Sequence, residues 1–392
     1  MKKNITYYVE QDLIESNAQE QINNIAQFDG IEQIAVYPDI HYCDEKAIPV
    51  GLTFATKNVI FPLITGKDMG CGVSYLKIPK TDVKARFRKE EHYNALNNYQ
   101  NQFTDERLGG GNHFLSLEED DNNLYIICHT GTRNLGIYMF QSNYGILQKN
   151  GGEQFISVER LLNQRPDWFI DYDKVINYGK RRRAEFCYRT LQFLINNDYV
   201  IGIKDKDYLK NPLHSFNYEY GDSVHNHIKK EGDYYIHRKG STELNNDIVV
   251  IPLSMTRGSL FVKKIKDDVN ALNSCSHGAG RKLSRTDTLK YWNSALKEKE
   301  RKEYAKAFSE MLSKNGKFSN GYLQEFDFAY KDSSNISSND IDIKAFFKFA
   351  NKIDNTDLKK ILHNLSDDLI DTLHSNISEG KNPEHLTRED KE

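Results

Sequence analysis

Residues 124–136, LYIICHTGTRNLG, join an apolar run to a polar turn that contains two glycines. The run Leu124–Cys128 has the length of one strand and predicts a buried β-strand. The histidine at its end, His129, and Arg133 in the turn predict a metal ligand beside an anion-binding loop, with a polar hairpin turn as the alternative. Four further runs predict strands of the same kind: Ile34–Val36, Leu52–Phe54, Val73–Leu76 and Ile248–Ile251.

Apolar residues at helical spacing occur in three other places. Asp173–Asn196 predicts one long amphipathic helix, and Thr286–Lys314 predicts a charged helix. Ile343–Ile377 predicts a pair of helices that packs on the rest of the chain or docks a protein, without contacting nucleic acid, because its charges are mainly acidic. Since strands and helices do not alternate regularly, we expect a mixed α/β (α+β) fold and no doubly wound sheet.

The bulk properties are those of a soluble globular protein. Of 392 residues, 38% are hydrophobic and 28% are charged, and no apolar stretch is long enough to cross a membrane. The N-terminus lacks the apolar segment of a secretory signal, so a cytoplasmic location is expected. Five cysteines without CxxC spacing argue against a disulfide framework. With a net charge of −3, binding to a polyanion would need a local basic patch such as 180–183, whose alternative interpretation is a solvated helix face.

Five short clusters carry the residues that are suited to chemistry, and most of them contain glycine. They are 66–72, 108–114, 128–136, 224–227 with 236–242, and 276–285. Asp68 and Cys71 stand three residues apart and can face one metal ion, and His113 follows three glycines. Alternate residues of an extended segment point the same way, so His225 and His227 are expected to share a face. His277 opens a turn of small residues that a large substrate can approach.

Each cluster also has a simpler interpretation, such as a glycine turn around a small buried cysteine or a histidine packed in the core. Together they predict a metal site that handles phosphates. From ligand chemistry alone, the mixture of Asp, Cys and His favours zinc, since thiolate is a soft ligand and manganese prefers oxygen.

The order of the motifs and their residues resemble the RtcB family of RNA ligases. The matching strings begin with YPDIH at 37–41, PVG at 49–51 and DMGCG at 68–72. GGGNHF, HTGTRNLG, VHNH, HRKGST, IPLSM, HGAGR and FAYKD follow in the family's order, so the resemblance spans about residues 35–332. The residues of these motifs are most similar to those of a short bacterial branch, some members of which are encoded beside release factor H.

The resemblance implies one catalytic domain, residues 1–332, around a deep metal-lined cleft. Residues 343–377 would then be a helical C-terminal extension and 378–392 a disordered tail. It implies two Mn²⁺ ions, which differs from the zinc favoured above. Their ligands would be Asp68, Cys71, His113, His129 and His225, with Cys71 able to bridge both ions.

The implied activity is GTP-dependent ligation of RNA 3′-phosphate or 2′,3′-cyclic phosphate ends to 5′-hydroxyl ends, in RNA repair or tRNA splicing. His277 matches the family's guanylylated histidine. The implied nucleotide pocket comprises Asn112, His113, Phe114, Leu115, Ser116, His225, Asn226, Pro252, Leu253, Ser254, Met255, Ser259, His277, Gly278, Ala279, Gly280 and Tyr330. Expected phosphate or RNA contacts are Arg133, Arg182, Arg183, Arg238, Lys239 and Arg281. The sequence does not name an activating protein.

Two departures from the family pattern affect the nucleotide. Ser116 stands where the family has a glutamate that reads guanine, so we expect weaker discrimination against ATP unless Glu118 or Glu119 takes over the role. The chain also continues for about sixty residues beyond FAYKD, which leaves the family's terminal lysine without a match. These departures support an alternative, a related metal-dependent nucleotidyltransferase or phosphate-processing enzyme with altered specificity. A non-catalytic RNA-binding relative is disfavoured, because it would not need His277.

Overall fold

The computed structural model describes residues 4–43, 48–85, 108, 112–203, 218–244, 248–254, 257–264, 268–283, 285–295, 297–299, 301 and 327–331. The expected helical extension 343–377 and tail 378–392 lie outside the described residues. So do Met255, the glycines 109–111 and most of the expected helix beyond residue 301.

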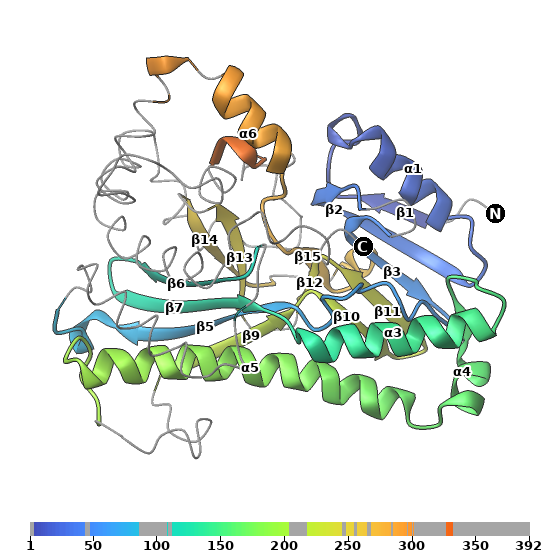
Figure 1. Cartoon of the computed structure of the whole chain (residues 1–392), viewed down its shortest axis with the longest axis horizontal. Coiled ribbons are helices and arrows are strands. Elements are labelled where there is room, and N and C mark those ends of the chain that lie inside the picture. Colours follow the sequence, from blue (N-terminus) through green and yellow to red (C-terminus); the bar gives the residue numbers. More distant parts are fainter. Residues whose placement is uncertain are drawn as a thin grey trace.

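One half of the fold is a five-stranded sheet in the order β1-β2-β3-β11-β10. Its strands are β1 (Asn4–Tyr7), β2 (Ile31–His41), β3 (Val50–Thr56), β11 (Tyr234–Lys239) and β10 (Asn226–Glu231). β1 and β2 are parallel, and the other pairs are antiparallel. A parallel pair needs a crossover, which α1 (Ser16–Ile25) supplies beside this sheet (Figure 1). Ile22 and Ile25 on α1 are buried in the same apolar core as Ile34.

The other half is an antiparallel four-stranded sheet in the order β6-β7-β5-β9. Its strands are β6 (Phe114–Glu119), β7 (Asn123–Thr130), β5 (Gly72–Pro79) and β9 (Glu219–Val224). The long helix α5 (Trp168–Asn196) runs along it and contacts β5 and β7 (Figure 1). Because side chains alternate along a strand, Leu76 and Ile126 share a core with Phe186 of α5. Tyr75 and Ile127 instead belong to a second core that includes Val250.

Three two-stranded ribbons and further helices complete the described part. The ribbons pair β13 (Val249–Ser254) with β14 (Gly258–Val262), β12 (Ser241–Glu243) with β15 (Ser274–Ser276), and β4 (Val59–Ile60) with β8 (Ile156–Ser157). The other α-helices are α3 (Asn134–Lys149), α4 (Val158–Gln164) and α6 (Arg285–Ser294). Short 3₁₀ turns occupy Gln11–Leu13, Lys80–Asp82, Val269–Ala271 and Asp327–Ala329.

The expected mixed α/β class is confirmed, and every predicted strand lies within an observed one or overlaps it. The predicted helix Asp173–Asn196 is also present, and it begins earlier, at Trp168. No helix in the described part is long and apolar enough to span a bilayer. A single residue, His225, separates β9 of one sheet from β10 of the other, so it stands at the junction of the two halves.

Candidate active site

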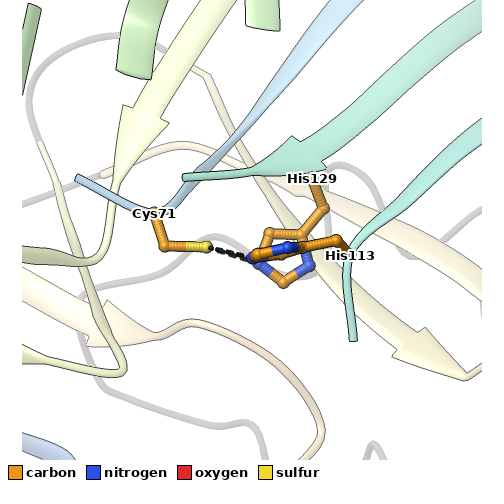
Figure 2. Close-up of side chains that lie close together, drawn as sticks. All are labelled: Cys71, His113 and His129. Carbon is orange, nitrogen blue, oxygen red and sulfur yellow. Dashed lines mark hydrogen bonds between the residues drawn. The ribbon is translucent and has the colours of Figure 1, made fainter. Parts of the chain in front are cut away.

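Three buried side chains converge at one end of the four-stranded sheet. Cys71 directly precedes β5, His113 directly precedes β6, and His129 lies near the end of β7. Their ligand atoms lie within 4.8 Å of one another (Figure 2). Cys71 Sγ is 3.3 Å from His113 Nε2 and 3.2 Å from His129 Nε2. The sheet register explains the convergence, because antiparallel pairing aligns the start of β5, the end of β7 and the start of β6 at the same end of the sheet.

The other two predicted ligands adjoin this cluster. Asp68 Oδ2 lies 3.3 Å from His113 Nε2, and His225 Nε2 lies 3.3 Å from His129 Nε2. The structure therefore brings all five predicted ligands into one continuous group, with contributions from both halves of the fold.

The protonation states of the group suit a cation. Burial lowers the pKa values of His129 and His225 well below the usual range, so both imidazoles are neutral and can offer a lone pair. Burial opposes ionisation of Asp68, but the nearby His113 outweighs it and holds the pKa of this carboxyl below its usual value. Burial and the charge of Asp68 raise the pKa of the Cys71 thiol. A metal ion would have to displace that proton.

The packing of donor atoms also fits a metal. Two neutral imidazoles whose Nε2 atoms lie 3.3 Å apart can share at most one N–H···N bond. Within the described residues, the Nδ1 atoms of His113 and His225 are buried and have no hydrogen-bond partner. Sulfur, nitrogen and carboxylate oxygen that crowd together in this way match the ligand set of a first-row transition metal.

His277 lies beside the cluster, immediately after β15. Its ring centroid is 4.8 Å from that of His225. Its Nδ1 is bonded to Oδ2 of Asp39, a carboxylate of β2 that is fully buried. The backbone N–H groups of His277 and Gly278 donate to the same oxygen, at 2.9 and 3.3 Å. In the neutral ring Asp39 holds the Nδ1 proton, so Nε2 is the nitrogen that carries the lone pair.

The Asp39–His277 pair is electrostatically coupled. Burial lowers the pKa of His277, but the Asp39 carboxylate outweighs it and raises the pKa above the usual value. Burial likewise raises the pKa of Asp39, and the charge of His277 together with its hydrogen bonds holds the net value below the usual range. Asp39 is part of the YPDIH string but was not among the predicted site residues. Only its place in that motif could have identified it, because the contact spans 238 positions.

Two glycines allow the backbone of this segment to pack closely. Gly280 has φ +71°, and a Cβ on it would lie 2.6 Å from Cα of Asp39. Gly51 has φ +90°, and its Cβ would lie 2.6 Å from the backbone nitrogen of Ile40. Any side chain at either position would displace the segment that carries Asp39.

The predicted nucleotide pocket falls on the strands next to the cluster. Phe114, Leu115 and Ser116 lie on β6, Pro252 to Ser254 on β13, and Ser259 on β14. The turn after His277 is tied to β13, because Ala279 N–H donates to the Pro252 carbonyl at 3.1 Å. Asn226 is tied to the metal-site loop through a 3.1 Å bond from Nδ2 to the Asp68 carbonyl.

A buried glutamate links two of the three serines of this pocket. The hydroxyls of Ser116 and Ser259 both donate to Oε1 of Glu118, each at 3.0 Å. Glu118 is 5% exposed, and burial raises its pKa. Glu119 points elsewhere and pairs with Lys80 at 3.1 Å. Of the two glutamates expected to replace a carboxylate at position 116, only Glu118 is bonded to Ser116.

The prediction that Arg182 and Arg183 contact RNA is wrong. Both side chains are buried on α5, at 1% and 0% exposure, and their donors are used inside the protein. Arg183 binds Asp222 at 2.6 Å and the Gly70 carbonyl at 2.8 Å, while Arg182 donates to the Gly131 carbonyl. These arginines therefore brace the loops that carry Cys71 and His129.

Arg238 is also misassigned as a phosphate contact. It has no exposed surface, and it donates to Glu231 and to the Ser274 hydroxyl, both at 2.8 Å. Lys239 is 7% exposed, and its Nζ lies 3.5 Å from Cys43 Sγ. The remaining candidates are more accessible: Arg133 is exposed at the start of α3, and Arg281 is partly buried beside Tyr330.

The expected shared face of His225 and His227 is not observed. The strand is interrupted at His225, which turns into the cluster. His227 instead lies 3.4 Å from Glu243 and 3.3 Å from Arg238. It is a member of a buried charge network, and no predicted metal ligand contacts it.

Comparisons with known proteins identify the family of the chain. A family model described as tRNA-splicing ligase RtcB matches residues 21–98 and 83–345. RNA-splicing ligase RtcB2 of Escherichia coli strain ATCC 25922 is 23% identical over 314 residues, which cover 70% of this chain and 75% of that protein. RNA-splicing ligase RtcB1 of the same strain and RNA-splicing ligase RtcB of strain K12 are each 25% identical over 345 residues, covering 71% of this chain and 81% of theirs.

Proposed function

The chain belongs to the tRNA-splicing ligase RtcB family and is an RNA ligase, and we propose that it joins RNA 3′-phosphate or 2′,3′-cyclic phosphate ends to 5′-hydroxyl ends with GTP as co-substrate. The observation that carries this proposal is the position of His277. Its ring contacts a predicted metal ligand, and its Nδ1 is held by a buried carboxylate.

We propose that Asp68, Cys71, His113, His129 and His225 hold two Mn²⁺ ions. The convergence of the five side chains and the neutral state of His129 and His225 support a divalent metal here. When bound, such ions neutralise phosphate oxygens and lower the pKa of an attacking hydroxyl. The choice of manganese rests on the family resemblance.

In the first step, Nε2 of His277 attacks the α-phosphorus of GTP. A P–N bond forms, the bond to pyrophosphate breaks, and His277 carries GMP. Asp39 keeps the Nδ1 proton in place and stabilises the positive charge that the ring acquires, as the carboxylate of a catalytic triad does.

In the following steps, GMP passes from His277 to an RNA 3′-phosphate. Where the RNA end is a 2′,3′-cyclic phosphate, water first opens the ring to give that 3′-phosphate. The 5′-hydroxyl of the second RNA then attacks that phosphorus, and GMP leaves. Arg133 and Arg281 are the proposed phosphate contacts, because they retain accessible surface near the site.

The alternative is a related nucleotidyltransferase that uses another nucleotide or another RNA end. Ser116 favours it, since the family's carboxylate is missing at that position. Glu118 disfavours it, since a buried carboxylate stands next to Ser116. The two functions differ in the nucleotide that labels His277. A cytoplasmic location stays a prediction.

The test is covalent labelling. Incubation with α-labelled GTP and Mn²⁺ should yield an acid-labile, alkali-stable protein adduct, and the loaded enzyme should seal RNA with the stated ends. His277→Ala should abolish both, while Lys290→Ala, on an exposed face of α6, should leave both unchanged. An adduct that persists in His277→Ala would place the nucleophile elsewhere.

A further inference from the structure

Lys331 forms hydrogen bonds to the backbone on both sides of Asp39. Its Nζ donates to the carbonyl of Pro38 at 2.9 Å and to that of Ile40 at 3.0 Å. The residue between these two carbonyls is the one that holds Nδ1 of His277. Among the described residues, Lys331 has no acidic side chain within bonding distance, so its donors serve backbone alone.

Lys331 also fixes the segment on the opposite side of the Asp39–His277 contact. Its backbone N–H donates to the Gly280 carbonyl at 2.9 Å, and a β-bridge joins Arg281 to Tyr330. One residue therefore ties β2, which carries Asp39, to the turn that begins at His277. The two segments lie more than 230 positions apart in the sequence, and chain connectivity alone does not align them.

The carboxylate of Asp39 needs this support. It is fully buried, and within the described residues its Oδ1 has no hydrogen-bond partner. A buried carboxylate that is only partly hydrogen-bonded is costly and would reorient if the structure allowed it. The ammonium of Lys331 supplies nearby positive charge as well as the two bonds that restrain the backbone.

We propose that Lys331 is a positioning residue for the nucleophile: by holding the carbonyls of Pro38 and Ile40, it aims the Asp39 carboxylate at His277. The inference rests on the proposed role of His277. Lys331 does not touch the reacting atoms and acts through Asp39.

The first experiment measures the rate of adduct formation in the full chain. Lys331→Met removes the charge and both donors at similar length, and we expect the maximal rate to fall by about 10- to 100-fold, as small misplacements of reacting groups do. The KM for the nucleotide should change little, because Lys331 is not proposed to bind it. Lys331→Arg, which can donate to both carbonyls, should recover most of the rate. Lys290→Met on α6 is the matched surface-lysine control.

A double-mutant cycle separates positioning from general stability. If Lys331 acts through Asp39, the double variant Asp39→Asn/Lys331→Met should be no slower than Asp39→Asn alone. Multiplied losses in the double variant, or a full rate in Lys331→Met, would overturn the inference.

A readout without nucleotide keeps the inference separate from the proposed function. Nitrogen NMR of ¹⁵N-histidine protein should show His277 with a fixed Nδ1–H in the wild type and with a mixed tautomer population in Lys331→Met. An unchanged tautomer would count against the inference even if labelling fails. Absence of any adduct in the wild type, with the tautomer change present, would reject only the proposed function.

Discussion

The ring centroids of His277 and His225 lie 4.8 Å apart, with the ring planes inclined by 53°. One of these residues is the proposed nucleophile and the other is a proposed metal ligand. An ion at the cluster and a phosphate at His277 would therefore lie close together. A substitution at the metal cluster should thus alter the reactivity of His277, and a substitution at His277 should alter metal binding.

Metal content should depend on Cys71. Its sulfur lies 3.3 and 3.2 Å from two imidazole nitrogens, so it is the central donor of the proposed cluster. Cys71→Ala should reduce bound Mn²⁺ from about two per chain to below one, as measured by elemental analysis after gel filtration. Cys43→Ala, outside the cluster, should retain the metal. Full occupancy in Cys71→Ala would remove this residue from the ligand set.

Metal binding should release a proton and weaken as the pH falls. Burial and Asp68 raise the pKa of the Cys71 thiol, so the apo protein holds the proton at pH 7 and a bound ion must displace it. Below the thiol pKa, affinity should drop by about tenfold per pH unit for this one proton. Calorimetry in buffers of different ionisation heat measures the release. Binding heat that does not depend on the buffer would contradict the expectation.

Adduct formation should rise with pH through a midpoint above the usual histidine value. The attacking imidazole must be neutral at Nε2, and Asp39 raises the pKa of His277, so the active form is lost as the pH falls. Asp39→Asn should move the midpoint to lower pH and reduce the plateau rate by about a hundredfold or more, since the ring loses its orienting partner. A variant with an unchanged midpoint would show that Asp39 does not set this pKa.

Base selection should depend on Glu118. The carboxylate bonded to Ser116 and Ser259 stands in the proposed pocket, whereas Glu119 pairs with Lys80 outside it. Glu118→Gln should reduce the preference for GTP over ATP by about tenfold or more, measured as the ratio of adduct rates. Glu119→Gln is the control and should keep the wild-type ratio. An equal ratio in all three proteins would show that Glu118 does not select the base, and a wild-type ratio near or below one would favour the alternative function.

Arg183 should matter for stability and not for RNA affinity. It is fully buried and paired with Asp222, so Arg183→Ala leaves a buried carboxylate unpaired and should cost about 3–5 kcal/mol in urea unfolding. Lys180→Ala, on the exposed side of the same helix, should cost almost nothing. A loss of RNA binding in Arg183→Ala without a loss of stability would restore the original interpretation.

The convergence of the proposed ligands was accessible from the sequence, because they lie in recognisable motifs and four of them stand at or beside strand ends. Asp68, Cys71, His113, His129 and His225 all join the group that the motifs imply. Residue type alone could not tell which basic residues are exposed. Arg182, Arg183 and Arg238 look like phosphate contacts in the sequence, but tertiary packing buries them.

The sequence also did not predict contacts between residues that are far apart along the chain. Asp39 and Lys331 were both visible inside quoted motifs, yet their roles depend on contacts across more than 200 positions. Local pattern carries no information on such pairings. The interruption of the strand at His225, which separates it from His227, is likewise set by the meeting of two sheets.

The position of the His225 junction in the chain also bears on the order in which the site can be completed during synthesis. Cys71, His113 and His129 belong to the four-stranded sheet, whose last strand ends at Val224. Their residues leave the ribosome before His277, and Lys331 follows later still. All five proposed metal ligands, from Asp68 to His225, therefore precede the proposed nucleophile along the chain. On the proposed function, a nascent chain would carry its proposed metal ligands before it could react with a nucleotide, because that reaction needs His277 from a later segment.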